Sequence, residues 1–99
     1  MNKEIATSLA DTKLKEVIQW DTEKILKLLE EPILEEIEKS RTLYQVRTSA
    51  FWEDKKNGQI RVNVAVDDGG FWSTLHPLVR SDFISISKDR NQTNMPRDN

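Results

Sequence analysis

The residues best suited to chemistry lie in the C-terminal half of this 99-residue chain, where Asp67 and Asp68 precede two glycines and His76 is the single histidine. Adjacent carboxylates could ligate a hard metal ion or act as an acid/base pair. Neighbouring side chains of a strand point to opposite faces, however, and Asp-Gly is a favoured turn pair. We therefore expect Asp67 to be a strand residue that pairs with Arg47, and Asp68 to begin a tight turn.

His76 could act as a general base, with Asp68 or Asp82 as its carboxylate partner. No serine or acid stands at a spacing that indicates such a partner, and a zinc site would need carboxylates for its other ligands because the chain contains no cysteine. Gly69-Gly70 is followed by strand-like residues rather than by the helix of a phosphate loop. The sequence therefore predicts no catalytic set, no metal site and no cofactor.

The composition excludes several classes of protein. Fifteen basic against seventeen acidic residues give a net charge of -2, which disfavours a generally basic nucleic-acid binder. No apolar stretch approaches the ~20 residues of a membrane helix. The first residues contain no continuous apolar core, so we expect no secretory signal and a cytoplasmic protein. The length suits one domain, expected over residues 1–87, and a tail over 88–99 too polar to bury itself, expected to be disordered.

The first half of the chain has a helical hydrophobic period. Its large apolar residues fall within a stripe about 120° wide, as in an amphipathic helix. Asp21 would interrupt this stripe and is a good N-cap, so we expect a second helix to begin there. The stripe consists of Leu14, Val17, Ile18, Ile25, Leu28 and Leu29.

Pro32 disfavours helical geometry at the residue before it. Ile33, Leu34 and Ile37 then resume helical spacing. We therefore expect a kink or a restart, with helical segments from 3 to 39. The first ten residues have only Ile5 and Leu9 to bury, and we expect them to be loosely held.

From Thr42 onward the period changes to two, which is typical of half-buried antiparallel strands. The alternating positions are Tyr44, Val46, Thr48, Ala50 and Trp52, then Ile60, Val62, Val64 and Val66. A three-residue loop, Lys56-Asn57-Gly58 with Gly58 left-handed, keeps the apolar side chains on one face. The predicted pairs are Trp52–Val62, Ala50–Val64 and Thr48–Val66 on that face, and Glu53–Arg61 and Arg47–Asp67 on the other.

A second, two-residue turn at Asp68-Gly69 predicts a strand that starts with Phe71 opposite Val66 and Leu75 opposite Val62. A loop around His76-Pro77 and a last strand over 82–87 would follow. The expected fold is α+β: two or three N-terminal helical segments on one face of a three- or four-stranded antiparallel sheet, helical over 3–39 and β over 42–87.

Two surfaces are candidates for binding. The predicted registers place Phe51, Ala65 and Trp72 together on the outer sheet face, rimmed by Arg47 and Arg61. Aromatic residues beside arginines are typical of protein-contact hot spots, and they could also stack single-stranded bases. The same face would carry no function if another segment covered it.

The second surface is the acidic run Glu30–Glu38. Glu35 and Glu36 would form a docking face for a basic partner, or simply a solvated helix face.

These observations leave three hypotheses. The first is a small intracellular protein-interaction module that binds another protein or a second copy of itself, as a regulator, adaptor or inhibitor/immunity-type partner. The alternative is a single-stranded RNA binder that uses the aromatic and arginine residues of the sheet face. The third is a small enzyme that uses His76 and a carboxylate.

Overall fold

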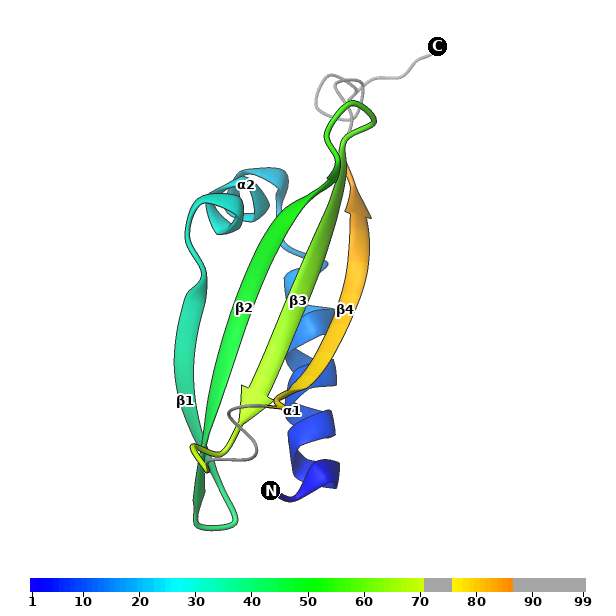
Figure 1. Cartoon of the computed structure of the whole chain (residues 1–99). Coiled ribbons are helices and arrows are strands. Elements are labelled where there is room, and N and C mark those ends of the chain that lie inside the picture. The colour runs from blue at the N-terminus through cyan, green and yellow to red at the C-terminus, as the bar shows by residue number, and fades with distance from the viewer. Residues whose placement is uncertain (71–75, 87–99) are drawn as a thin grey trace.

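The chain folds into two helices followed by a four-stranded antiparallel sheet, which confirms the α+β class (Figure 1). The computed structural model describes residues 1–70 and 76–86, so the tail expected over 88–99 lies outside the described residues. The elements are α1 (Lys3–Val17), α2 (Thr22–Glu30), β1 (Ile33–Lys39), β2 (Thr42–Asp54), β3 (Gln59–Asp67) and β4 (Leu78–Ser85). The strand order is β1-β2-β3-β4. Neither helix is long and apolar enough to cross a membrane.

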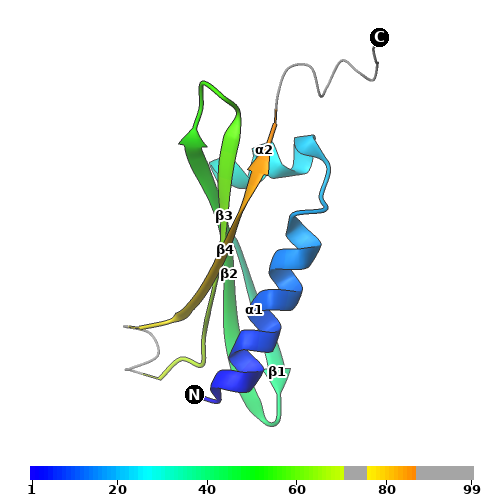
Figure 2. The ribbon, with the colours of Figure 1, turned by 90° about the vertical axis from the view of Figure 1, so that its right-hand side faces the viewer.

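The break between the helices lies where the sequence predicted it. The Asp21 carboxylate accepts a hydrogen bond from the backbone N–H of Lys24 at 2.9 Å and caps α2. Such a cap satisfies one of the free N–H groups of the first turn. Helix α1 lies along one side of the sheet (Figure 2).

Two alanines anchor the N-terminal part of α1. Ala6 and Ala10 are 0% exposed and pack in one cluster with Tyr44 and Val64 of the sheet. Small side chains let a helix approach a sheet closely, so their burial fixes α1 against the strands. The expectation that only large side chains would hold this segment overlooked these two positions.

The prediction of helix over residues 33–39 was wrong, because this segment is strand β1. Glu31 has extended backbone angles, as expected before a proline, and α2 ends there. Ile33 then lies opposite Thr48, and Ile37 lies opposite Tyr44. A spacing of four residues suits one face of a helix and one face of a strand equally, so the apolar pattern did not distinguish them.

The β2–β3 hairpin confirms the predicted alternation but shifts its register by two residues. Val62 lies opposite Ala50, and Ile60 lies opposite Trp52. The loop is four residues long, 55–58, with a bulge between Trp52 and Asp54. Gly58 is left-handed as predicted, with φ +71°.

The Asp54 carboxylate organises this loop. It accepts hydrogen bonds from the side chain of Asn57 at 2.8 Å and from its backbone N–H at 3.2 Å. These bonds hold the pKa of Asp54 below its ordinary value of 3.8. Asp54, the last residue of β2, thereby stabilises a loop that is one residue longer than the predicted three-residue loop.

The prediction of a two-residue turn at Asp68-Gly69 was also wrong. Val66 pairs with Val46 on one side and with Leu78 on the other, so no position beside it is left for Phe71. Strand β4 therefore comes from residues 78–85 rather than from the expected 82–87, and Phe71 and Leu75 themselves lie outside the described residues.

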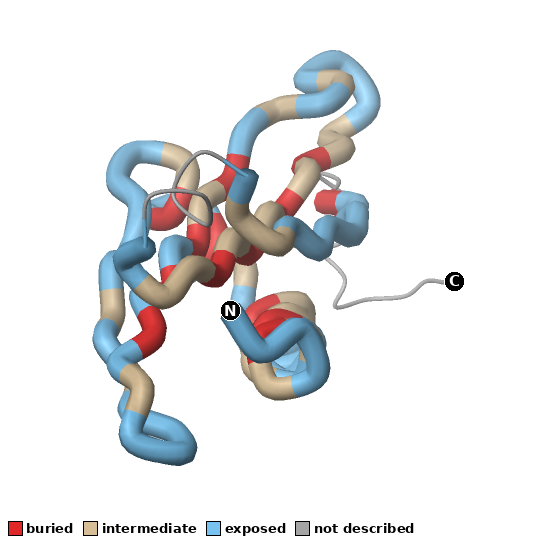
Figure 3. The backbone as a smooth tube through the Cα atoms, turned by 60° about the horizontal axis from the view of Figure 1, so that its bottom comes forward, coloured by how far each residue is buried: buried red, intermediate tan, exposed pale blue. Residues whose placement is uncertain are grey.

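The alternating side chains give the sheet two different faces. The inner face packs against the helices, and buried residues lie along the sheet and on the side of α1 that faces it (Figure 3). Full burial of each aliphatic side chain contributes about 1.5–3 kcal/mol. The fully buried strand residues of this face include Tyr44, Val46, Ile60, Val62, Val64 and Val66.

Candidate protein-interaction face

The other side of the sheet, here called the outer face, is covered by no helix or strand within the described residues (Figure 2). Its large apolar side chains are unusually open: Leu34 is 72% exposed, Phe51 48%, Val79 49% and Phe83 44%. Exposed apolar groups gathered on one face indicate a contact surface more strongly than scattered ones. The strand register sorts these four residues into two rows that cross the sheet, and a fifth exposed residue of this face, Leu43, lies outside both rows.

The aromatic row consists of Phe51, Arg61 and Phe83, side by side on β2, β3 and β4. The Arg61 guanidinium lies 4.1 Å from the centre of the Phe83 ring. It also donates hydrogen bonds to Glu53 and to the Ser81 hydroxyl, both at 3.0 Å. A guanidinium held by an ion pair, a hydroxyl and a ring has little conformational freedom left to lose on binding.

The aliphatic row consists of Leu34, Arg47, Ala65 and Val79, one residue from each strand. Arg47 forms no ion pair with any residue that the structure describes, in contrast to the predicted pair with Asp67. The shifted register explains the difference, because Arg47 lies opposite Ala65 and Asp67 lies opposite Gln45.

A shallow groove of about 720 Å³ follows this row. It is lined by Leu34, Arg47 and Ala65 of the row but not by Val79, and its other lining residues include Glu35, Glu36, Asp67 and Pro77. The groove therefore combines aliphatic side chains with one guanidinium and with acidic residues.

A row of small polar residues separates the aromatic from the aliphatic row. It contains Ser49, Asn63 and Ser81. Phe51 and Ala65 therefore share the outer face but are not neighbours, which corrects the predicted patch. Trp72, the third predicted member, lies outside the described residues.

The predicted acidic helix face does not exist, because Glu35 and Glu36 are strand residues that point to opposite faces. Glu35 lies on the inner side, where one carboxylate oxygen is 3.0 Å from Lys13 Nζ. Burial lowers the pKa of Lys13, but the contact with Glu35, and after it Glu16, outweighs burial and raises that pKa above its ordinary 10.5. Glu35 thus ties α1 to β1 and is engaged within the fold.

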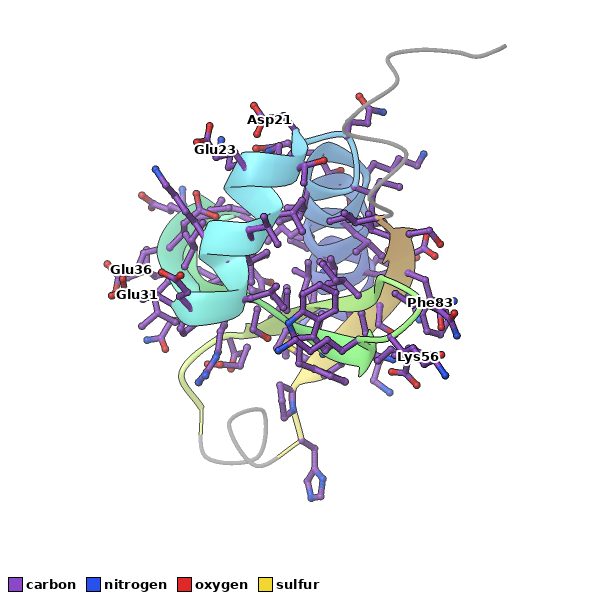
Figure 4. The ribbon with its side chains drawn as sticks, turned by 90° about the horizontal axis from the view of Figure 1, so that it is seen from above. Asp21, Glu23, Glu31, Glu36, Lys56 and Phe83 are labelled. Atoms are coloured by element: carbon purple, nitrogen blue, oxygen red, sulfur yellow. The ribbon has the colours of Figure 1, made fainter. Side chains whose placement is uncertain are left out.

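Glu36 is exposed on the outer face, at the edge of the sheet opposite to Phe83 (Figure 4). Glu31 belongs to the end of α2, whereas Asp21 and Glu23 lie at its start. The acidic residues are therefore distributed over two elements and both sheet faces.

The structure does not show the candidate catalytic residues in contact with one another: Asp68 and Asp82 each form contacts of their own, and His76 is exposed. The Asp68 carboxylate lies 3.4 Å from the terminal amino group of Met1 and accepts the N–H of Gly70. Asp82 accepts the N–H of Phe83 at 2.7 Å. His76 is exposed and is not among the residues that line the groove along the aliphatic row. Among residues 1–70 and 76–86, no three His, Asp or Glu side chains gather as a metal site.

Sequence reasoning missed three residues of the outer face: Leu34, Val79 and Phe83. Leu34 was assigned to a helix, and Val79 to a loop. Phe83 was placed in a last strand whose neighbour in the sheet was not predicted. Only the pairing of β4 with β3 brings Phe83 against Arg61.

Comparison with known proteins adds no assignment: no family model matches this chain, and neither a curated protein nor a solved structure matches it significantly.

Proposed function

We propose that this chain is a small protein-interaction module that docks a protein surface on the outer face of its sheet. The observation that carries the proposal is the pair of exposed apolar rows, each containing an arginine. Arginine and aromatic residues dominate the energetics of protein contacts, particularly where apolar groups surround them.

The same geometry favours protein over single-stranded nucleic acid. One side of the Phe83 ring is occupied by Arg61, whose charge is already paired with Glu53. A base would have to displace that guanidinium to stack there, and a phosphate would compete with a carboxylate. The face as a whole carries four carboxylates and two guanidinium groups. They belong to Glu36, Glu38, Glu53, Asp67, Arg47 and Arg61.

The test compares a double variant, in which one exposed apolar residue of each row is replaced, with a matched control variant. Phe51→Thr combined with Val79→Thr shortens one residue of each row, and the β-branched threonine suits a strand. Leu43→Thr is the control, because Leu43 is 49% exposed on the same face but lies opposite Glu38, away from both rows. Each tagged protein is incubated with a lysate of the cells that produce the chain, and retained proteins are quantified by mass spectrometry.

We expect a protein that the wild type and Leu43→Thr retain and that the double variant loses. Equal retention by all three proteins would contradict the proposal. Retained nucleic acid that nuclease and moderate salt remove would support the single-stranded RNA alternative instead, because counterion release makes such binding steeply dependent on salt.

A further inference from the structure

We propose that the open edge of β1 binds an extended segment of another protein that carries basic residues at every second position and joins the sheet as an additional strand. This inference goes beyond the proposed function, because it concerns the edge of the sheet rather than the docking of a protein surface on its outer face. Within the described residues, β1 pairs only with β2, and no strand lies along its other side. An unpaired strand edge is a template on which a peptide can add as a strand.

The turn between β1 and β2 determines which backbone groups of β1 point to that edge. Its two residues, Ser40 and Arg41, have φ of 50° and 65°, as in a two-residue hairpin turn that is closed by hydrogen bonds between the flanking residues. The flanking pair is Lys39 with Thr42. Hydrogen-bonded and non-hydrogen-bonded pairs alternate along an antiparallel ladder, so the backbone groups of every second residue point away from β2. These residues are Glu38, Glu36 and Leu34.

The side chains of the same three residues lie on the outer face, beside their free backbone groups. Leu34 is 72% exposed, and both glutamates are exposed as well. A strand added antiparallel to β1 would place alternate residues opposite Glu38, Glu36 and Leu34, in that order along its own chain. Opposite charges and apolar groups form the favourable cross-strand pairs. The complementary segment is therefore basic at its first and third positions and apolar at its fifth.

The charge around this edge favours a basic segment. Residues 30–41 contain five acidic and two basic residues, which gives a net charge of -3. Of the acidic residues, Glu35 is already in contact with Lys13 on the inner side. Glu36 and Glu38 form no ion pair with any residue that the structure describes, so both can pair with a cation that binds at the edge.

The edge at the other end of the sheet, on β4, differs from that of β1. Helix α1 contacts β3 and β4 and lies behind them, whereas β1 forms the opposite edge (Figure 1). Arg80 of β4 already pairs with Asp11 of α1, at 3.2 Å. The residues of β4 on the outer face carry no charge; they are Val79, Ser81, Phe83 and Ser85. Only the β1 edge therefore combines free backbone groups with outward carboxylates.

Binding of a labelled peptide to the purified full chain, measured by fluorescence anisotropy, tests the proposal. The probe is Gly-Lys-Val-Lys-Thr-Leu-Gly with blocked termini, whose lysines would lie opposite Glu38 and Glu36. Its control, Gly-Lys-Lys-Val-Thr-Leu-Gly, has the same composition and charge but directs its lysines to opposite faces. We expect the probe to bind at least about fivefold more tightly than the control. Equal affinities, or no binding of the probe at millimolar protein, would overturn the proposal.

Methylation of the peptide backbone tests whether the probe binds as a strand. In the proposed register, the N–H of the second lysine points to β1 and the N–H of the valine points away from it. An N-methyl group on that lysine removes a hydrogen bond and collides with β1, so it should weaken binding at least about tenfold. The same group on the valine should change the dissociation constant less than about threefold. Equal effects at the two positions would contradict strand addition.

Charge reversal tests the preference for a basic segment. Glu36→Lys combined with Glu38→Lys should weaken binding of the probe at least about tenfold, and should create binding of the peptide in which both lysines are replaced by glutamates. Glu4→Lys combined with Glu23→Lys is the matched control, because it reverses two exposed charges on the helices. It should change the affinity for the probe less than about threefold. Equal losses in the two double variants would show that only the net charge matters, and would overturn the proposed site.

These results also separate this inference from the proposed function. Phe51→Thr with Val79→Thr should leave binding of the probe unchanged within about twofold, because neither residue belongs to β1. If the probe does not bind but that double variant still loses a retained protein, the edge proposal is wrong and the docking face stands. If the probe binds as described while all variants retain the same proteins from the lysate, the edge proposal stands and the docking face is wrong.

Discussion

The inner and outer faces of the sheet are built from the same strands, yet they differ in what their side chains contact. On β3, Val62 and Val64 are fully buried beneath the helices, while Arg61 and Ala65 between them lie on an uncovered face. The inner face is aliphatic almost throughout. The outer face mixes apolar and charged groups, so it can remain in water and can also release apolar surface when a partner covers it.

The largest expected difference comes from truncating one residue on each face. Ile60 is 0% exposed in the cluster formed with Val17 and Ile25, so Ile60→Ala should cost about 2–5 kcal/mol of unfolding free energy. Phe51→Thr removes more atoms, but they belong to a side chain that is 48% exposed in the folded chain. It should therefore change the unfolding free energy by less than about 1 kcal/mol. Urea denaturation of both variants measures the contrast, and similar losses would contradict the division into two faces.

The next prediction concerns the position of β4, which supplies residues to both faces. A Cβ at Gly58 would meet the carbonyl of Ile86 at 1.5 Å, and Ile86 donates its N–H to Gly58 O at 2.6 Å. Gly58→Ala should therefore cost at least about 2 kcal/mol, from the left-handed backbone and from displacement of β4. Gly69→Ala is the control, because its φ is +82° but nothing lies within 4 Å. It should cost only about 1 kcal/mol, and equal losses by urea denaturation would show that the contact with Ile86 is unimportant.

A smaller effect, of opposite sign, is expected on the inner face. Thr48 is 1% exposed, and its hydroxyl has no hydrogen-bond partner among the described residues. Thr48→Val keeps the shape and removes a desolvated polar group, so it should raise the unfolding free energy by about 1 kcal/mol. Ser49→Val, its neighbour on the outer face, serves as the comparison and should gain less. A loss of stability in Thr48→Val, measured by thermal and urea denaturation, would contradict the assignment of an unsatisfied hydroxyl.

The smallest effect concerns the ion pair that ties α1 to β1. Because the pKa of Lys13 is raised above 10.5 in the folded chain, its contribution to stability is complete below that value. It should be lost as pH rises through the folded pKa. As pH rises above about 10.5, unfolding free energies should therefore decline more in wild type than in Lys13→Met, by less than about 1 kcal/mol. Parallel pH profiles of the two proteins would show that the pair contributes nothing.

The parts of the fold that could be predicted from the sequence were those whose apolar residues fit only one hydrophobic period, either that of a helix or that of a strand. Strict alternation in β2 and β3 identified both strands and their buried faces correctly. Asp21 combined a break in the helical stripe with a good capping residue, so the start of α2 was also correct. Composition and period therefore determined most elements without any knowledge of their neighbours.

The failures arose where local chemistry was ambiguous or absent. The turn between β1 and β2 uses Ser40 and Arg41 with φ of 50° and 65°, although neither glycine nor asparagine is present. Without that turn signal, the spacing of Ile33 and Ile37 suited a helix equally well. The register of β2 with β3 depended on a loop length that Asp54 stabilises, and the candidate face depended in turn on that register.

Strand β1 has a consequence for the behaviour of the protein at high concentration. Its far side has no neighbouring strand in the described sheet, so a row of backbone groups there is open to pairing with another chain. Glu36 and Glu38, both exposed, flank that edge with negative charge on the outer face. Two such edges would repel each other, so pairing of β1 with the β1 of another chain is disfavoured even where the protein is concentrated.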